Sequence, residues 1–315
     1  MRQRLIIVSA LLVAFVAVGY AAIQVAHLRR PTLMPVQASL APTEAAYLGV
    51  YEDGSPPSIA PVVSFGHVVG SMPNIVGWFA GWAQPFNLAF AQQTAAHKCI
   101  PFVQIDPTYA SVAGIAAGDY DAYLQSYADT VREFGKSVII GFGHEMNAPW
   151  YSWGYGHVPA ATFVAAWRHI VTLFRAQGAD NVTWLWTVNQ DRSNTGPISD
   201  WWPGAQYVTW VGIDGYYFGP DDDFSTVFAP TIHEVRALTN RPILLSETAI
   251  GPASGQFAKI ADLFAGMRTY RTLGLVWFDK DQDSGLYHQD WRIEGDQPAE
   301  AAFRLGMSAL TLVKS

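Results

Sequence analysis

The segment Ser137–Trp150 reads SVIIGFGHEMNAPW and joins two patterns of different character. Its first part, Ser137–Ile140, is a short apolar run of the kind that forms a buried β-strand. A histidine, a carboxylate and an amide follow within a few residues, and a tryptophan closes the segment. In folds built from parallel strands and helices, the loops at the carboxyl ends of the strands carry the chemistry. The segment therefore predicts a functional loop at the end of a buried strand.

The same strand pattern recurs along the chain. Eight strand-like runs lie at residues 47–51, 74–79, 100–105, 137–142, 182–187, 208–213, 242–246 and 274–278. Segments with helical spacing lie between them, and the clearest are Ala160–Ala176, Tyr120–Phe134 and Pro298–Val313, the last of which is expected to cover the eighth strand. Eight such units predict a single α/β domain, a closed (β/α)8 TIM barrel, over residues 46–315. An open doubly wound sheet is the alternative, but no glycine-rich phosphate turn opens any of the helical segments.

The N-terminal residues differ in character from this domain. Basic residues flank an almost unbroken apolar run at residues 5–26. That run exceeds the ~7–15 residues of a signal-peptide core and matches the ~20 that span a bilayer. We expect residues 1–30 to be a signal peptide or signal anchor and residues 31–45 a linker. The barrel would then be extracellular or at the cell surface, either secreted or held to the membrane by this N-terminal hydrophobic helix.

Composition narrows the possible partners of the domain. Half of the 315 residues are apolar and 14% are charged, as in a globular protein. Residues 31–315 carry 15 basic and 26 acidic groups, and such a body repels phosphates, so we expect no nucleic-acid partner. We also expect a monomer. Cys99 is the one cysteine of the chain, which excludes an intrachain disulfide, and we interpret it as a buried, inert thiol.

Two glutamates stand out as a candidate catalytic pair. Glu145 follows the strand quoted above, and Glu247 follows another buried-strand run, Pro242–Ser246. In a barrel, the carboxyl ends of the strands surround a common cleft. Hydrolysis of a glycosidic bond needs one carboxyl to protonate the leaving oxygen and a second to stabilise or attack the anomeric carbon. With twelve tryptophans available to stack on sugar rings, the pattern indicates a polysaccharide as the substrate.

Further candidates for substrate binding and for support of the catalytic pair also lie at or just past strand ends. They are Trp78, Asp106, His144, Asn147, Trp150, Asn189, Asp214, Tyr216 and Trp277. We expect no cofactor, because no phosphate-binding turn is present. We also expect no metal, since the second histidine of a His-Glu-x-x-His zinc motif is replaced by Ala148.

The segment His144–Trp150 resembles the fourth-strand signature of glycoside hydrolase family 26, a His-Glu-Met-Asn-Gly run with a tryptophan shortly after. Ala148 stands where the family usually has glycine. Matches to the family's later strands are Gly212–Tyr216, Ser246–Glu247 and Trp277. The resemblance covers roughly residues 46–310 and implies a retaining endo-β-glycanase on a (β/α)8 barrel. β-1,4-Mannan is the first expected substrate, with mixed-linkage β-glucan and β-xylan as alternatives.

The resemblance also implies a role for each residue of the pair. Glu145 would be the general acid/base and Glu247 the nucleophile, with Tyr216 holding Glu247 ionised through a hydrogen bond. The other implied roles are substrate contacts by His144 and sugar platforms formed by Trp150 and Trp277. A retaining mechanism places the two carboxyl groups ~5–5.5 Å apart. A non-catalytic carbohydrate-binding barrel is the alternative from another class, and it predicts that one of the two carboxylates is missing.

Overall fold

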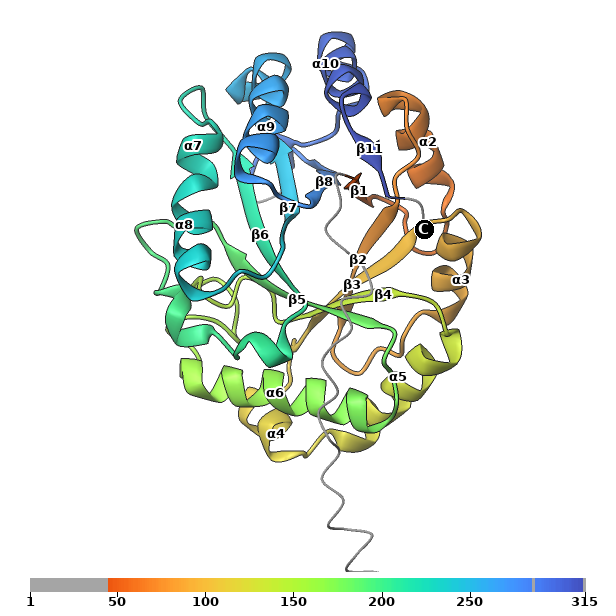
Figure 1. The fold of residues 1–315 in the computed structure, drawn as a ribbon, viewed down its shortest axis with the longest axis vertical. Helices are drawn as coiled ribbons and strands as arrows, with labels where there is room; N and C mark the ends of the chain where they lie inside the picture. Colours follow the sequence, from red (N-terminus) through yellow and green to blue (C-terminus); the bar gives the residue numbers. More distant parts are fainter. Residues whose placement is uncertain (1–44, 285–286, 314–315) are drawn as a thin grey trace, which may run out of the picture. The chain divides into compact units, whose positions relative to one another are not determined.

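The computed structural model describes residues 45–284 and 287–313, which form a closed barrel of parallel strands (Figure 1). The strands are β1 (Ala45–Glu52), β2 (Ile75–Gly81), β3 (Ile100–Asp106), β4 (Val138–Phe142), β5 (Val182–Asn189), β6 (Trp210–Tyr217), β7 (Ile243–Ile250) and β8 (Gly274–Asp279). Each strand pairs in parallel with the next, and β8 pairs with β1 to close the ring. The predicted (β/α)8 barrel is therefore confirmed, as are the positions of all eight strands.

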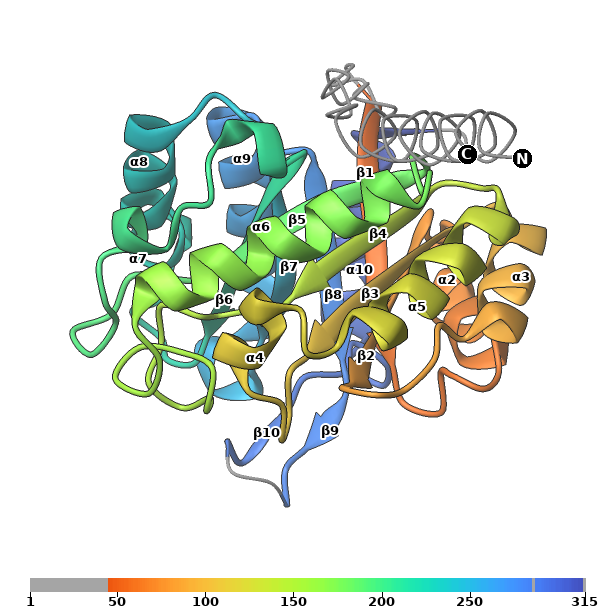
Figure 2. The same ribbon diagram turned by 90° about the horizontal axis from the view of Figure 1, so that it is seen from below.

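Helices surround this sheet, as the two views in Figures 1 and 2 show. They are α2 (Ala60–Val69), α3 (Leu88–Ala96), α4 (Val112–Ala117), α5 (Asp121–Phe134), α6 (Ala160–Ala176), α7 (Phe224–Val227), α8 (Ala229–Leu238), α9 (Gln256–Tyr270) and α10 (Gln297–Ser308). Three 3-10 turns, η1 (Ile198–Trp201), η2 (Ala205–Tyr207) and η3 (Pro252–Ser254), lie in the connections. Two further short strands, β9 (Asp281–Gln282) and β10 (Gln289–Asp290), form an antiparallel pair after β8.

Helix α6 illustrates how the apolar pattern becomes packing. Its residues Phe163, Trp167 and Phe174 recur at helical spacing and are buried. The rings of Trp167 and Phe174 meet Trp184 of β5 edge-on, at centroid distances of 6.3 and 5.2 Å. Burying one aromatic side chain removes roughly 150–250 Å² from water, which contributes on the order of 4–6 kcal/mol. Such contacts hold the helices against the strands and leave the strand ends to carry the site.

The predicted helix Pro298–Val313 is too long. Helix α10 ends at Ser308, and Thr311–Leu312 forms a short strand, β11, which pairs with Ala45 and Ala46 of β1. The cause is a local need for hydrogen bonds, because β2 pairs with β1 only from Gly49 onward. The start of β1 would otherwise expose unpaired backbone groups on that edge. As predicted, α10 covers the eighth strand, where Phe303 meets Trp277 edge-on at 5.3 Å.

The predicted signal segment, residues 1–30, and the linker up to residue 44 lie outside the described residues. Among the helices that the structure describes, none has both the length and the apolar character required to cross a bilayer. Cys99 is buried, and its thiol donates to the carbonyl oxygen of Pro73 at 3.1 Å. Burial raises the pKa of this thiol to about 11, so the prediction of an inert cysteine is confirmed.

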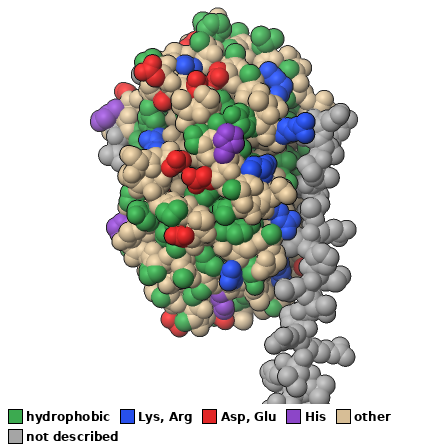
Figure 3. Space-filling model, turned by 60° about the vertical axis from the view of Figure 1, so that its left-hand side comes forward, with side chains coloured by type: hydrophobic (Ala, Val, Ile, Leu, Met, Phe, Trp, Pro, Cys, Tyr) green, Lys and Arg blue, Asp and Glu red, His purple; other side chains and the backbone are tan. Residues whose placement is uncertain are grey.

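Charged groups are dispersed over the surface of the barrel. On the face shown in Figure 3, Asp and Glu side chains occur in several small groups among hydrophobic and uncharged ones. Lys and Arg side chains are scattered over the same face.

Candidate active site

A cavity of about 540 Å³ lies at the carboxyl ends of the strands. Its wall is formed by Phe79, Asp106, His144, Glu145, Trp150, Tyr151, Asn189, Arg192, Tyr216, Phe218, Glu247, Phe278, Lys280, Gln282, Tyr287 and Trp291. Both predicted catalytic glutamates are among them, although about a hundred positions separate them in the sequence. The barrel thus brings the two carboxyl groups into one aromatic-lined cavity.

Glu145 is held by hydrogen bonds on both carboxylate oxygens. Trp150 Nε1 donates to Oε2 at 2.7 Å, and Asn189 Nδ2 donates to Oε1. The backbone of Glu145 has φ = 54°, a left-handed conformation that costs a non-glycine residue roughly 1–3 kcal/mol. Its N–H donates to the carbonyl oxygen of Thr187 on β5 at 3.0 Å, which helps to hold this conformation. The strained backbone of Glu145 therefore directs its carboxylate into the cavity.

Asn147 fastens this loop to β5 and does not line the cavity. Its Nδ2 donates to the carbonyl oxygen of Asn189 at 3.0 Å, and its Oδ1 accepts from the N–H of Asn189 at 2.8 Å. The side chain is fully buried, and this backbone pairing occupies both ends of its amide. Asn147 thus supports the site by positioning the residue that binds Glu145, and it does not face the cleft.

A β-bulge in β7 sets the direction of Glu247. Leu245 pairs with Ile213 of β6, but the next pair joins Glu247 to Asp214, so that Ser246 is an extra residue in β7. Such a bulge re-aims the side chains that follow it, and bulges are common beside active sites. The hydroxyl of Ser246 donates to Asp214 Oδ1 at 2.5 Å. The extra residue and the acid below it together present Glu247 to the cavity.

The two oxygens of Glu247 have different environments. Tyr216 Oη donates to Oε2 at 2.9 Å, whereas Oε1 is buried and has no hydrogen-bond partner among the described residues. Burial raises the pKa of the Glu247 carboxyl to about 7, against the opposing effects of the His144 charge and the Tyr216 hydrogen bond. Glu247 is therefore mostly ionised only above about pH 7. The Tyr216 hydrogen bond is present as expected, but it does not by itself keep Glu247 ionised below that pH.

His144 carries a positive charge between the acids. Its Nδ1 lies 2.9 Å from Asp106 Oδ1, and its Nε2 lies 3.2 Å from Tyr151 Oη. Burial alone would lower the pKa of His144, but the negative charges of Asp106, Glu247 and Glu145 raise it to about 10. As an imidazolium, the ring donates from both nitrogens. It thereby partly offsets the negative charge gathered around the cavity.

Asp214 lies beneath the cavity and not in its wall. Its side chain is fully buried, and it accepts the hydrogen bond from Ser246 described above. Burial, together with the charges of Glu247 and Glu145, raises the pKa of Asp214 well above its usual range. A neutral carboxylic acid at this depth suits a residue that supports the bulge, so Asp214 belongs to the support of the catalytic pair and not to the cavity wall.

Two of the predicted sugar-binding tryptophans point away from the cavity. Trp78 packs against Phe90 of α3 at 5.2 Å, and Trp277 packs against Phe303 of α10. Side chains alternate between the two faces of a strand, so the residue that follows each tryptophan faces inward. Those residues, Phe79 and Phe278, line the cavity in their place. The predictions for Trp78 and Trp277 are therefore wrong by one position along the strand.

The remaining predicted residues lie where the sequence suggests. Trp150, Asp106, Asn189, His144 and Tyr216 all belong to the cavity wall. Sequence analysis missed the other wall residues, which are Phe79, Tyr151, Arg192, Phe218, Phe278, Lys280, Gln282, Tyr287 and Trp291. Most of them lie in long loops after β4, β6 and β8. Tyr151 could have been found from its place next to Trp150, and the two phenylalanines on strands from the alternation rule.

A (β/α)8 barrel that holds two carboxyl groups in one aromatic-lined cavity defines a class of protein, the barrel glycosidases. Within that class, residues 80–307 match the model of glycosyl hydrolase family 26. This match covers well over half of the chain, and the chain belongs to that family of glycoside hydrolases.

Relatives of known activity act on several polysaccharides. Endoglucanase H of Acetivibrio thermocellus is 30% identical over 273 residues, which cover 81% of this chain and 30% of that protein. A β-1,3-xylanase of an Alcaligenes species is 25% identical over 58% of this chain and 39% of its own length. A mannan endo-1,4-β-mannosidase of Bacillus subtilis is 25% identical over 55% of this chain and 50% of its own length. The chain thus spans half or less of each of these relatives.

Solved structures support the fold. The Bacillus subtilis mannanase BCman superposes with a TM-score of 0.64 at 18% identity, covering 90% of both chains. A modular endo-β-1,4-mannanase from Cellulomonas fimi gives a TM-score of 0.65 at 16% identity, covering 86% of this chain and 72% of that one. At such identities the likeness establishes the barrel and carries no information about the substrate.

Proposed function

We propose that the chain is a retaining endo-β-glycanase in which Glu145 is the general acid/base and Glu247 the nucleophile. One observation carries this assignment, the contrast between the two carboxyl groups in the same cavity. Both oxygens of Glu145 accept hydrogen bonds, whereas Oε1 of Glu247 is left without a partner among the described residues. A nucleophile needs an oxygen that no donor holds, and Oε1 of Glu247 meets that need; because this oxygen is buried, the side chain must turn it toward the anomeric carbon.

The proposed reaction has two steps. In the first, Glu145 donates its proton to the glycosidic oxygen while Oε1 of Glu247 bonds to the anomeric carbon and the leaving sugar departs. In the second, Glu145 takes a proton from water, whose oxygen attacks the same carbon and releases Glu247 as a carboxylate. Tyr216 holds Oε2 of Glu247 throughout, and the imidazolium of His144 lowers the energetic cost of its negative charge.

We propose β-1,4-mannan as the substrate, with a β-glucan as the main alternative. The mannosidase relative supports mannan, but the match to the endoglucanase extends over 81% of this chain and favours a β-glucan. β-Xylan is a third candidate substrate, because one relative is a β-1,3-xylanase. The residues that select among these sugars are those of the cavity wall, through hydrogen bonds that one sugar completes and another leaves unmade.

A panel of these polysaccharides tests the proposal. Wild type is expected to release short oligosaccharides from one of them, with the β configuration retained in the first product seen by NMR. Glu145→Ala should still form a glycosyl-enzyme from an aryl glycoside with a good leaving group, because that step needs no acid. Glu247→Ala should form no such intermediate. Equal, negligible turnover by all three proteins would instead indicate the carbohydrate-binding barrel.

We also propose that the enzyme acts outside the cell or at its surface, as a monomer on polysaccharide and not on nucleic acid. The support is the apolar run at residues 5–26 with its basic flanks and the acidic balance of residues 31–315. Cell fractionation tests this directly. The full chain should be found in the membrane fraction or the medium, and deletion of residues 5–26 should retain it in the cytoplasm.

A further inference from the structure

Three acidic side chains meet at the seam of the barrel, outside the cavity wall. Glu52 ends β1, and its backbone partner across the sheet is Asp279, which ends β8. Glu294 lies in the segment between β10 and α10. One carboxylate oxygen from each residue lies within 4.8 Å of the others. This cluster joins the first strand, the last strand and the segment that leads into the last helix.

The hydrogen bonds of the cluster are incomplete. Glu52 is 8% exposed, and its Oε1 is buried without a hydrogen-bond partner among the described residues. Asp279 is 1% exposed, and its Oδ1 accepts from Trp277 Nε1 at 3.1 Å and from the N–H of Ile293 at 3.0 Å. Those two donors orient the Asp279 carboxylate, which also contacts Glu52 and Glu294. A buried carboxylate oxygen with no partner is costly, and a bound cation would satisfy it.

The three acids also repel one another, because an ionised carboxylate makes it harder to ionise its neighbours. Three carboxyl groups so close together cannot all be ionised unless a positive charge lies between them.

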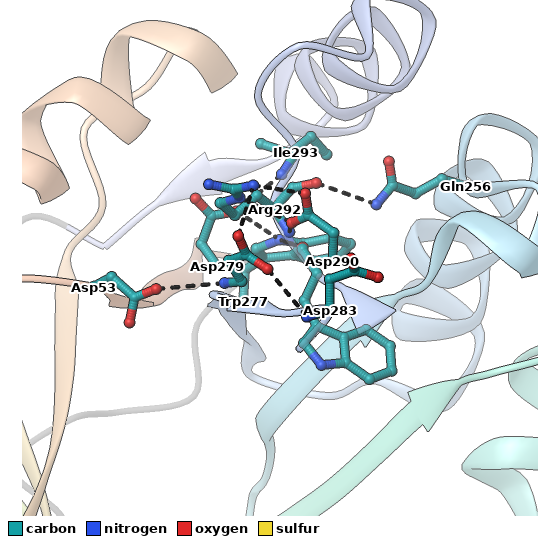
Figure 4. Close-up of polar contacts among 10 residues, drawn as sticks. Asp53, Gln256, Trp277, Asp279, Asp283, Asp290, Arg292 and Ile293 are labelled. Carbon is teal, nitrogen blue, oxygen red and sulfur yellow. Dashed lines mark hydrogen bonds and ion pairs between the residues drawn. The ribbon is translucent and has the colours of Figure 1, made fainter. Parts of the chain in front are cut away.

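Two basic side chains in this region are engaged with other acids. Lys280 Nζ lies 3.3 Å from Asp53 Oδ1. Arg292 lies 2.7 Å from Asp290 and 3.2 Å from Asp281, and Figure 4 shows it in the polar network around Asp279. Each of these cations is thus paired outside the cluster.

We propose that Glu52, Asp279 and Glu294 bind a Ca²⁺ ion that fixes the seam of the barrel. Carboxylate oxygens are the ligands that Ca²⁺ prefers, at 2.3–2.6 Å, and two oxygens on one ion are then at most ~5 Å apart. The three oxygens lie within 4.8 Å of one another, so small side-chain adjustments would bring all three into contact with one ion. Zn²⁺ favours nitrogen and sulfur ligands, and Mg²⁺ demands a tighter octahedron. Water would complete the coordination from the side of the exposed Glu294.

The ion would act on the cavity indirectly. The segment between Asp279 and Glu294 carries Gln282, Tyr287 and Trp291 of the cavity wall. Binding at both ends of this segment limits its motion, so the ion is expected to stabilise the barrel and improve substrate binding. It takes no part in bond breaking, because none of its three ligands lines the cavity.

Calorimetry and thermal unfolding of the full chain test this proposal. After treatment with chelator and removal of the chelator, titration with CaCl₂ should show one ion bound per chain. Ca²⁺ at about a hundred times its Kd should raise Tm on the order of 5 °C. Mg²⁺ at the same concentration should have a smaller effect. Glu294→Gln, at an exposed position where folding is not at risk, and Glu52→Gln should each abolish most of the Tm increase.

Asp283→Asn is the matched control, because it removes one exposed negative charge from the same segment and breaks no ion pair of Lys280 or Arg292. It should keep the full Tm increase. The proposal is overturned if wild type binds no Ca²⁺, since the acids then share protons instead. It is also overturned if Glu294→Gln and Glu52→Gln respond to Ca²⁺ as wild type does, or if Asp283→Asn loses the response to the same extent as they do.

Discussion

The hydroxyl of Tyr216 offers a direct test of how the cavity prepares Glu247. It donates to Oε2 at 2.9 Å and thereby stabilises the ionised carboxylate. Burial raises the pKa of Glu247 to about 7, and this hydrogen bond opposes that rise. Tyr216→Phe removes the donor and keeps the ring. The pKa of Glu247 should therefore increase, and the ionised nucleophile should be lost at pH values where wild type still has it.

The size of the effect follows from the strength of the bond. A hydrogen bond to a charged group contributes about 1.5–3 kcal/mol, and 1.36 kcal/mol corresponds to one pH unit. The acidic limb of kcat/KM should thus move from about pH 7 to roughly pH 8–9. At pH 6 the variant should lose an additional factor of about 10–100 relative to wild type. Tyr216 itself does not ionise in this range, since burial raises its pKa well above the usual value.

The assay is kcat/KM measured from pH 5 to 9.5, expressed as the ratio of variant to wild type so that any shared alkaline limb cancels. The ratio should rise with pH. Tyr287→Phe is the control, because Tyr287 lines the same cavity but makes no hydrogen bond to Glu247 in the described structure. It should leave the limb near pH 7. A ratio for Tyr216→Phe that stays constant with pH would refute the reasoning, because the hydroxyl would then act on substrate and not on the nucleophile.

Three further variants test other parts of the site. Asp106→Asn should lower the pKa of His144 from about 10, because the nearest negative charge is lost, and an NMR titration of the imidazole that shows no decrease would contradict this. Trp150→Phe removes the donor to Oε2 of Glu145 and should reduce kcat about tenfold, equivalent to ~1.4 kcal/mol, whereas a change confined to KM would indicate simple sugar stacking. Trp78→Ala should cost about 3–5 kcal/mol in urea unfolding and leave KM unchanged, and a large rise in KM would place the indole in the cleft after all.

The barrel was predictable because its signals are local and repeated. Each strand is a short apolar run, and α6 carries an apolar stripe strong enough that the predicted Ala160–Ala176 matches the observed helix end to end. The pairing of the strands follows once eight such units are recognised. The predicted helix Pro298–Val313 was too long for a different reason. Strand β11 forms because it pairs with the start of β1, which lies more than 260 positions away in the sequence. The local sequence carries no signal for such long-range pairing.

The sequence predicted which strand ends contribute residues to the candidate site. It did not predict the direction in which each side chain points. Loops such as the one after β8 bring Trp291 to the wall through long-range packing, for which the sequence holds no periodic signal. The three acids of the proposed Ca²⁺ site are likewise far apart in sequence and match no ligand motif. Their proximity results from the closure of β8 onto β1, so it emerges only with the barrel.

Alternation along the strands explains the tryptophan errors, and a break in that alternation at the β7 bulge gives Glu247 its direction. On β2 and β8 an apolar residue stands on either face, so composition cannot decide which aromatic of Trp-Phe faces the cavity. Tryptophan was assigned to the cavity face on both strands because it stacks well on sugars, and this assignment was wrong both times. On β7 the bulge at Ser246 resets the alternation, and simple counting from Leu245 no longer predicts the direction of Glu247. Ser246→Ala keeps the extra residue and removes only the hydroxyl that donates to Asp214, so it should retain measurable activity in a folded barrel; a complete loss of turnover would show that the hydroxyl, and not the bulge, positions Glu247.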